Sequence, residues 1–445
     1  MDLTEAYRKL NDIELVSITM TSDQGGQANL AGICKHISIY EEVGYPFLSA
    51  EIKIIDARSI ASHMPITGHE VVNIQYRTPG IGSKIVDIDL EVVSMSGREK
   101  AKGDRSEIYT LQLKSKNLRL DSSKKVYGPY EGRISEMVKE IMDRYLVTSK
   151  GDLIQKTLGT HKFVIPAMKP VEAINWLSTR CTSAEPPHNA DFHFYETVDG
   201  TNFVSLGSIA QAKPYRSYHT RPSSLDRRLD SVIEDFLRIQ EVKISKDFNR
   251  ELDLLGGGIA GNMVTHDITY KELKYSRYNH VQNFDESDHI EDFRSMPTNS
   301  KYLASLEGPY YFAPKQNMNY GEGFDNNYNQ EDYLLKSLST RSMWNHNKIN
   351  ITVAGDSTLR AGHVVEVTFP SNEPKDKNDP NWYSKYESGK YLISAIRHVI
   401  FNESPFDYTC MLELCRDSSP KAIPTESKFL GTSKNFKDNS ESVFA

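Results

Sequence analysis

This sequence has few cysteines and lacks long apolar runs and long basic runs. Four cysteines in 445 residues are too few for a disulfide framework, so we expect reduced thiols in a cytoplasm. No stretch of about 18 apolar residues occurs, so no segment is predicted to span a membrane. A net charge of −7 without a long Lys/Arg run argues against tight binding of a nucleic-acid backbone.

Catalytic and metal-binding patterns are missing as well. The Gly-Asp-Ser sequence at 355–357 resembles the nucleophile block of SGNH-type esterases. However, no later Asp is followed three residues on by the histidine that would take the serine proton. His188 and His193 flank Asp191, yet no His-Glu-x-x-His or Cys-x-x-Cys pattern completes a metal shell. The sequence therefore predicts no catalytic residue, no metal site, no cofactor and no enzymatic activity.

The glycine-rich run 256–261 is not a phosphate-binding loop, because it lacks the Gly-Lys-Ser/Thr ending that supplies charge and a metal ligand. We expect a flexible turn there, or a close backbone approach to another chain.

What the sequence does contain is a set of β-strands in its first 120 residues. The segment 86–92 alternates strictly, which predicts a half-buried antiparallel strand. Its apolar face is formed by Val86, Ile88, Leu90 and Val92, and its acidic face by Asp87, Asp89 and Glu91. The acidic face is either an ordinary solvated surface or the lining of a channel, where like charge would keep DNA from adhering.

The sequence contains an internal repeat: one pattern of β-strands occurs twice, roughly three hundred residues apart. Each copy begins with a Gly-His pair and a Val-rich strand, continues with a second strand, and closes with a strand that starts at Tyr-Thr. Two near-equivalent surfaces per chain would let three chains form a ring of six similar units. The predicted core and ring-forming positions are Gly68, His69, Val72, Ile74, Val86, Ile88, Leu90, Val92, Gly362, His363, Val365, Val367, Leu392, Ile396 and Leu412.

The middle of the chain has a different pattern. Residues 134–146 follow the spacing of an amphipathic helix, and a second helix is predicted to begin at Pro170. Asp199-Gly200 favours the tight turn of a β-hairpin. We therefore divide the chain into a first β domain (1–121), a middle α+β domain (122–240), an irregular, extended region at subunit contacts (241–332), a second β domain (333–418) and a polar C-terminal tail (419–445).

The second β domain resembles a known family. The segments 351–367 and 388–398, and the strand that begins at Tyr408, are similar to the second tail-tube-like domain of the central baseplate hub proteins of contractile-tailed bacteriophages. A helix precedes that domain in the family, as the predicted helix 333–345 does here. The segment 166–182, where a proline-containing strand end leads to a helix with Asn-Trp-Leu, is similar to the family's middle domain.

The resemblance implies a fold that is mainly β with α+β insertions. Two tail-tube-like antiparallel β-barrel or sandwich domains would accompany a middle α+β domain. It also implies a homotrimer that forms a pseudo-sixfold ring. This ring would join a hexameric tail tube, or a tube-initiator protein, to a trimeric central spike protein.

The resemblance further implies a channel for transient passage of DNA or a tape-measure protein, and baseplate wedge proteins as further partners. The chain would be a virion protein of the tail baseplate, assembled in the host cytoplasm.

Two other functions are compatible with the sequence. A receptor- or carbohydrate-binding tail-tip module would expose aromatic side chains at a sugar cleft, although the chain has only three tryptophans. A tail-associated hydrolase would need two carboxylates at a defined separation in space, which a sequence does not specify.

Overall fold

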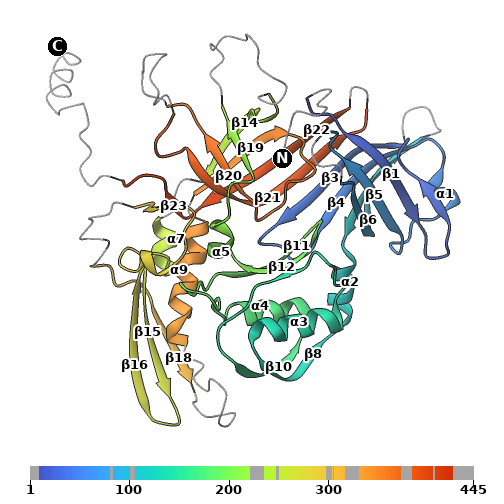
Figure 1. Ribbon diagram of the computed structural model, residues 1–445. Helices are drawn as coiled ribbons and strands as arrows, with labels where there is room; N and C mark the ends of the chain where they lie inside the picture. The colour runs from blue at the N-terminus through green and yellow to red at the C-terminus, as the bar shows by residue number, and fades with distance from the viewer. Residues whose placement is uncertain are drawn as a thin grey trace, which may run out of the picture.

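The computed structural model describes residues 10–80, 84–100, 106–220, 235–246, 250–296, 303, 305–315, 330–345, 347–371, 383–403 and 406–423. Antiparallel strands dominate these residues, so the predicted fold class is confirmed. In Figure 1 a broad layer of strands, coloured blue and orange to red, lies above the middle domain and above a separate small sheet in yellow. None of the described helices has the length and apolarity that a membrane span requires.

The first β domain contributes seven strands to the broad layer. In Val71–Arg77, strict alternation of buried and accessible residues places one side of the strand in the core. The strands are β1 (Glu14–Thr21), β2 (Gln27–Asn29), β3 (Cys34–Glu42), β4 (Ser49–Asp56), β5 (Val71–Arg77), β6 (Val86–Lys100) and β7 (Glu107–Lys114), with the short helix α1 (Ile60–His63) between β4 and β5.

The second β domain repeats this strand order. The first domain is ordered β3-β4-β7-β6-β5, and the second is ordered β14-β19-β22-β21-β20. The strands of the second domain, with the additional β13, are β13 (Arg216–His219), β14 (Glu241–Lys246), β19 (Asn347–Ala354), β20 (Val364–Thr368), β21 (Gly389–Phe401) and β22 (Asp407–Arg416). The predicted internal repeat is therefore present in the connectivity as well as in the sequence.

The two β domains are joined edge to edge. Residues 36–42 of β3 pair antiparallel with residues 395–401 of β21, which makes one 13-stranded sheet. We call this pairing the β3–β21 joint. The sheet is open along its described strands, so neither domain forms a closed barrel there. A single apolar core lies behind both halves and includes Ile37, Val72 and Leu412.

The middle domain packs two helices against short sheets. Helix α3 (Ile134–Tyr145) buries Ile134, Met137, Val138, Ile141 and Met142, and both the helix at 134–146 and the helix that begins at Pro170 are confirmed. The remaining elements are α2 (Lys116–Ser123), β8 (Val126–Gly132), β9 (Leu153–Ile154), β10 (His161–Met168), α4 (Pro170–Ser178), β11 (Phe192–Thr197), β12 (Gly200–Ser205) and α5 (Leu206–Ala210). Strands β11 and β12 form the predicted hairpin around Asp199 and Gly200.

The region 241–332, which the sequence predicts to be irregular, contains regular structure. Its strand β14 belongs to the main sheet, and β15, β16 and β18 form a separate three-stranded sheet. Strand β18 pairs parallel with β15 from far along the chain, so local sequence carries little signal for it. The elements are α7 (Arg250–Leu255), β15 (Ala260–Asp267), β16 (Glu272–Asn279), η1 (Phe284–Glu286), β17 (Phe293–Arg294), β18 (Tyr310–Lys315) and η2 (Gln330–Asp332).

Helix α9 (Leu334–Trp344) then leads into the second β domain, as predicted, and the short β23 (Ser418–Ser419) ends the described structure of that domain. Residues 424–445 of the predicted polar tail lie outside the described residues.

Candidate functional site: the polar face of the joined sheet

The acidic residues of β6 lie on the accessible side of the sheet, opposite a buried apolar row. Val86, Ile88, Leu90 and Val92 are all 5% exposed or less, whereas Asp87 and Asp89 face solvent. Asn73 of β5 donates from Nδ2 to Asp87 Oδ1 at 2.7 Å and to Asp89 Oδ1 at 2.9 Å. These amide hydrogens partly offset the carboxylate charges without removing them from water.

Glu91, the third acid of the row, is held by a cation from a neighbouring element. Arg119 of α2 donates from Nε and from Nη2 to the Glu91 carboxylate at 2.9 Å each. The hydrogen bonds to Glu91 raise the pKa of the Arg119 guanidinium. The acidic row is thus a fixed, hydrogen-bonded surface rather than a set of independent side chains.

The same polar face continues across the β3–β21 joint. Arg397 of β21 donates from Nη2 to the Ser38 hydroxyl of β3 at 3.0 Å, and its guanidinium lies 5.2 Å from the ring centroid of Tyr40. Next to this contact the face is hollowed, with a volume of about 330 Å³. The hollow is lined from both β domains by Tyr40, Glu42, Glu241, Lys243, Arg397 and Glu413, among others.

The apolar positions that we predicted from the repeat lie in the common core. Val72, Ile74, Val365, Val367, Leu392, Ile396 and Leu412 are each 2% exposed or less. Gly68 and Gly362 both have left-handed φ values, +92° and +89°, at the turn that leads into β5 and β20. A role of these positions in forming a ring is a matter of proposal.

The two histidines of the repeat are not structurally equivalent. The Val92 N–H of β6 donates to the Glu70 carbonyl at 2.9 Å, and the Ile393 N–H of β21 donates to the His363 carbonyl at 2.9 Å. His363 therefore occupies the place of Glu70, one residue after His69. Burial lowers the pKa of His363 to about 4, whereas His69 is exposed.

Sequence reasoning missed a buried carboxylate at which three domains meet. Glu41 of β3 is fully buried, and its Oε1 and Oε2 accept the N–H groups of Val198 and Ala361, each at 2.9 Å. Val198 belongs to the middle domain and Ala361 to the second β domain. Burial raises the pKa of Glu41, and the guanidinium of Arg360, 3.9 Å away, opposes this effect. A signal existed: Glu41 continues the buried alternation of Ile37 and Ile39.

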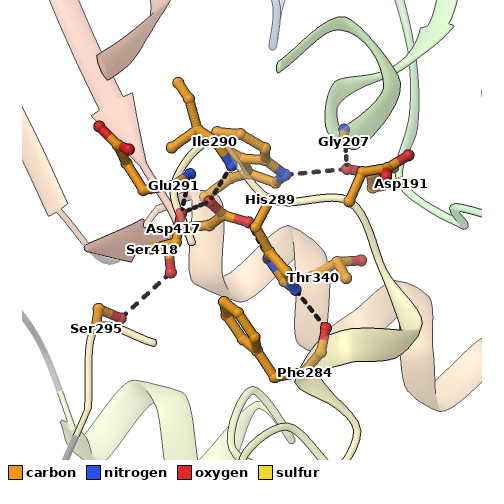
Figure 2. A network of polar contacts seen from close by, with 12 residues as sticks. Asp191, Gly207, Phe284, His289, Ile290, Glu291, Ser295, Thr340, Asp417 and Ser418 are labelled. Atoms are coloured by element: carbon orange, nitrogen blue, oxygen red, sulfur yellow. Dashed lines mark hydrogen bonds and ion pairs between the residues drawn. The ribbon is translucent and has the colours of Figure 1, made fainter. Parts of the chain in front are cut away.

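A second buried network of polar contacts joins the middle domain, the region 241–332 and the end of β22. Figure 2 shows His289 between the Asp417 carboxylate and the backbone carbonyl of Phe284. Its Nδ1 lies 2.6 Å from Asp417 Oδ2, and its Nε2 lies 2.7 Å from Phe284 O. Both ring nitrogens face acceptors, an arrangement that only the protonated, cationic ring satisfies in full.

Asp191 extends this network without forming a metal site. Its carboxylate accepts hydrogen bonds from Trp344 Nε1 at 3.0 Å and from the Gly207 N–H at 2.9 Å. His188 and His193 instead bond backbone carbonyls through Nδ1. No group of three possible metal ligands occurs among the residues that the structure describes.

The Gly-Asp-Ser sequence is structural. The Ser357 Oγ accepts the Thr78 N–H at 3.0 Å, and the Asp356 carboxylate pairs with Arg216 Nε at 3.0 Å. Both side chains are buried. Ser357 links the two β domains, whereas Asp356 links the second β domain to its additional strand β13. Within the chain, the glycine-rich run 256–261 closely approaches helix α9. A Cβ on Gly258 would lie 2.5 Å from Ser342 Oγ.

Solved structures define the class of fold. The tail protein from Neisseria meningitidis MC58 is 12% identical with a TM-score of 0.51, and the match covers 92% of this chain and 99% of that chain. The 43 kDa tail protein of prophage MuSo2 from Shewanella oneidensis is 9% identical with a TM-score of 0.52, and the match covers 92% and 100%. The chain therefore has the fold of phage tail proteins.

A curated relative is more specific. The chain is 21% identical over 392 residues to the probable baseplate hub protein gp334 of Vibrio phage KVP40, which covers 86% of this chain and 90% of that protein. No protein-family model matches the sequence. The predicted resemblance to baseplate hub proteins is thus confirmed, and it extends well beyond the second β domain.

Proposed function

We propose that the protein is a structural hub of a contractile-tail baseplate. In this role it is a homotrimer whose six tube-like domains form a pseudo-sixfold ring between a hexameric tail tube and a trimeric central spike. The observation that carries the proposal is the β3–β21 joint. Two domains with one strand order meet edge to edge in one sheet, so each chain already contains one lateral contact of such a ring.

The polar face of the joined sheet suits the inner wall of this ring. One side of the sheet is packed into the common core, and the other presents Asp87, Asp89, Glu91 and Glu413 with interspersed cations. A wall of this kind would let DNA pass without adhering, because its carboxylates repel phosphates. The similarity to a hub protein and to tail proteins supports the same placement, in the tail baseplate of a virion.

The proposal is tested by the mass and shape of the purified protein. We expect light scattering to give a trimer, and class-averaged electron micrographs of the same sample to show six similar lobes around a hole. Trimeric spike protein added to the sample should dock at one end of the ring. A compact monomer that also ignores the spike protein would contradict the proposed role.

A further inference from the structure

Two strands of this chain are equivalent, through the internal repeat, to the two strands that pair in the β3–β21 joint. Strand β14 corresponds to β3, and strand β6 corresponds to β21. Strand β21 carries a register shift against β22 between Ile393 and Ala395. Strand β6 carries the same irregularity against β7 between Val92 and Ser94. These bulges align Ser94 with Ala395. A second register shift in β6, between Ser96 and Glu99, adds one residue that β21 lacks. Beyond it, Glu99 corresponds to Val399, because Glu99 pairs with Ile108 of β7 and Val399 pairs with the equivalent Thr409 of β22.

Beyond its bulge, β21 changes partner. Residues 389–392 pair with β20, and residues 395–401 pair on the same side with β3. In β6, residues 86–91 pair with β5. Residues 94–100 of β6 pair with β7 but with no other strand of the described chain. This half-strand is exposed except at the partly buried Met95, and Val93, just before it, is 52% exposed.

Strand β14 corresponds to β3. Strand β3 pairs with β21, but β14 has no such neighbour on its outer edge among the described strands. The pairing of β3 with β4 and of β14 with β19 aligns His36–Ile39 with Glu241–Ile244. Ile37 and Ile39 are fully buried, whereas the corresponding Val242 and Ile244 are 39% and 53% exposed. Among the described strands, none pairs with the outer edge of β14.

We propose that β14 of one copy pairs with residues 94–100 of β6 in a second copy and reproduces the β3–β21 joint between chains. Each chain offers one edge of each kind, so the contact is head-to-tail and can close into a ring. The number of chains in that ring rests on the proposed hub function, but the pairing itself does not.

The repeat also specifies the register. Ser38 pairs with Val399 in the β3–β21 joint, and these positions correspond to Lys243 and Glu99. The intermolecular pairing therefore sets Lys243 directly opposite Glu99 of the next copy, on the polar face. Both side chains are exposed in the single chain, and opposite charges at such a position stabilise cross-strand pairing.

Charge exchange between the two positions tests the inference. Glu99→Lys and Lys243→Glu should each weaken self-association on the order of tenfold, and the double variant E99K/K243E should restore it. The measurement is the self-association constant from sedimentation or concentration-dependent light scattering. Restoration by the double variant separates a direct contact from general damage to the fold.

Cross-linking tests the register independently. In the double variant E99C/K243C, oxidation should link chains into covalent oligomers, because directly opposed Cβ atoms lie within disulfide reach. The matched control is E99C/V242C, whose side chains point to opposite faces of the sheet and should not link. The four native cysteines are buried, so the unmodified protein should stay unlinked.

The outcomes separate this inference from the hub function. A trimeric ring that neither cross-links through E99C/K243C nor responds to charge exchange overturns the β14–β6 pairing and leaves the hub role intact. Linked chains that ignore the spike protein support the pairing and contradict the hub. A protein that stays monomeric at every concentration overturns the pairing.

Discussion

The polar side chains at the domain boundaries are buried, whereas those of the polar face lie in solvent. Glu41 is fully buried and holds backbone groups of two other domains, whereas Asp87 and Asp89 lie exposed on β6. Loss of a buried, hydrogen-bonded side chain is costly because its partners remain desolvated. Substitutions of single polar residues should therefore lower the free energy of unfolding at the domain boundaries and change it little on the polar face.

Glu41→Gln should lower the free energy of unfolding by about 3 kcal/mol. Glutamine keeps one acceptor and places an amide donor against the second backbone N–H, so that group loses its partner. The control is Glu42→Gln at the neighbouring exposed position, which should change stability by less than about 0.5 kcal/mol. Urea unfolding of both variants measures the difference. Equal effects at the two positions would contradict a bridging role of Glu41.

His289→Gln should destabilise the protein in a pH-dependent way. Burial alone would lower the pKa of His289, but the Asp417 carboxylate and the Phe284 carbonyl outweigh it and raise that pKa above its usual 6.5. Burial would likewise raise the pKa of Asp417, but His289 lowers it below its usual 3.8.

The His289 cation stabilises the fold fully below pH 6.5, and its contribution is lost as the pH rises through its folded pKa. The Asp417 contribution is lost only as the pH falls through its own depressed pKa. The free energy of unfolding of the wild type should therefore exceed that of His289→Gln by about 3 kcal/mol near pH 6. This difference should narrow by pH 9. Unfolding curves at several pH values measure the gap, and a constant gap would show that His289 is neutral in the folded protein.

At the scale of elements, regular local patterns were predictable and long-range pairings were not. The alternation of residues 86–92 and the helical spacing of 134–146 specify β6 and α3 because neighbouring residues carry the signal. The sheet of β15, β16 and β18 escaped prediction because its apolar core is small and its outer strands expose Tyr275 and Phe312. Its parallel partner also lies far along the chain.

The candidate site was predictable in part for the same reason. The acidic row on β6 follows from the alternation alone. The β3–β21 joint and Glu41's partners depend on which distant edges meet, and a single sequence leaves that open.

The region 241–332 packs against α9 at Gly258, where a side chain would have no room. Gly258→Ala would place a Cβ 2.8 Å from Ser342 Cβ and 3.1 Å from the Asp253 carbonyl, so helix or loop must shift. We expect a loss of about 1–3 kcal/mol. Gly32→Ala is the control, because a Cβ there meets nothing within 4 Å, and it should change stability by less than about 1 kcal/mol. Thermal unfolding compares the two, and an unchanged midpoint for Gly258→Ala would show that α9 yields freely.

At the scale of the whole molecule, the two β domains form one continuously packed unit. They share a sheet, a core and the buried contact of Ser357 with Thr78. A rigid pair of ring units would keep a threefold assembly close to sixfold, because the two domains could not drift apart within a chain. In micrographs of the ring, the lobes within one chain and between chains should therefore be evenly spaced. Three close pairs of lobes would indicate that the intermolecular contact differs from the β3–β21 joint.

The β3–β21 joint also has a consequence for the timing of synthesis. Arg397 follows its partner Ser38 by 359 positions. At about 5–20 residues per second, a ribosome needs roughly 20–70 s to cover that distance. During this interval the edge of the nascent β3, which carries Ile37 and Ile39, has no strand to pair with. Pairing of β21 with β3 is thus a late closing step, and a chain truncated before β21 should aggregate rather than fold as a smaller domain.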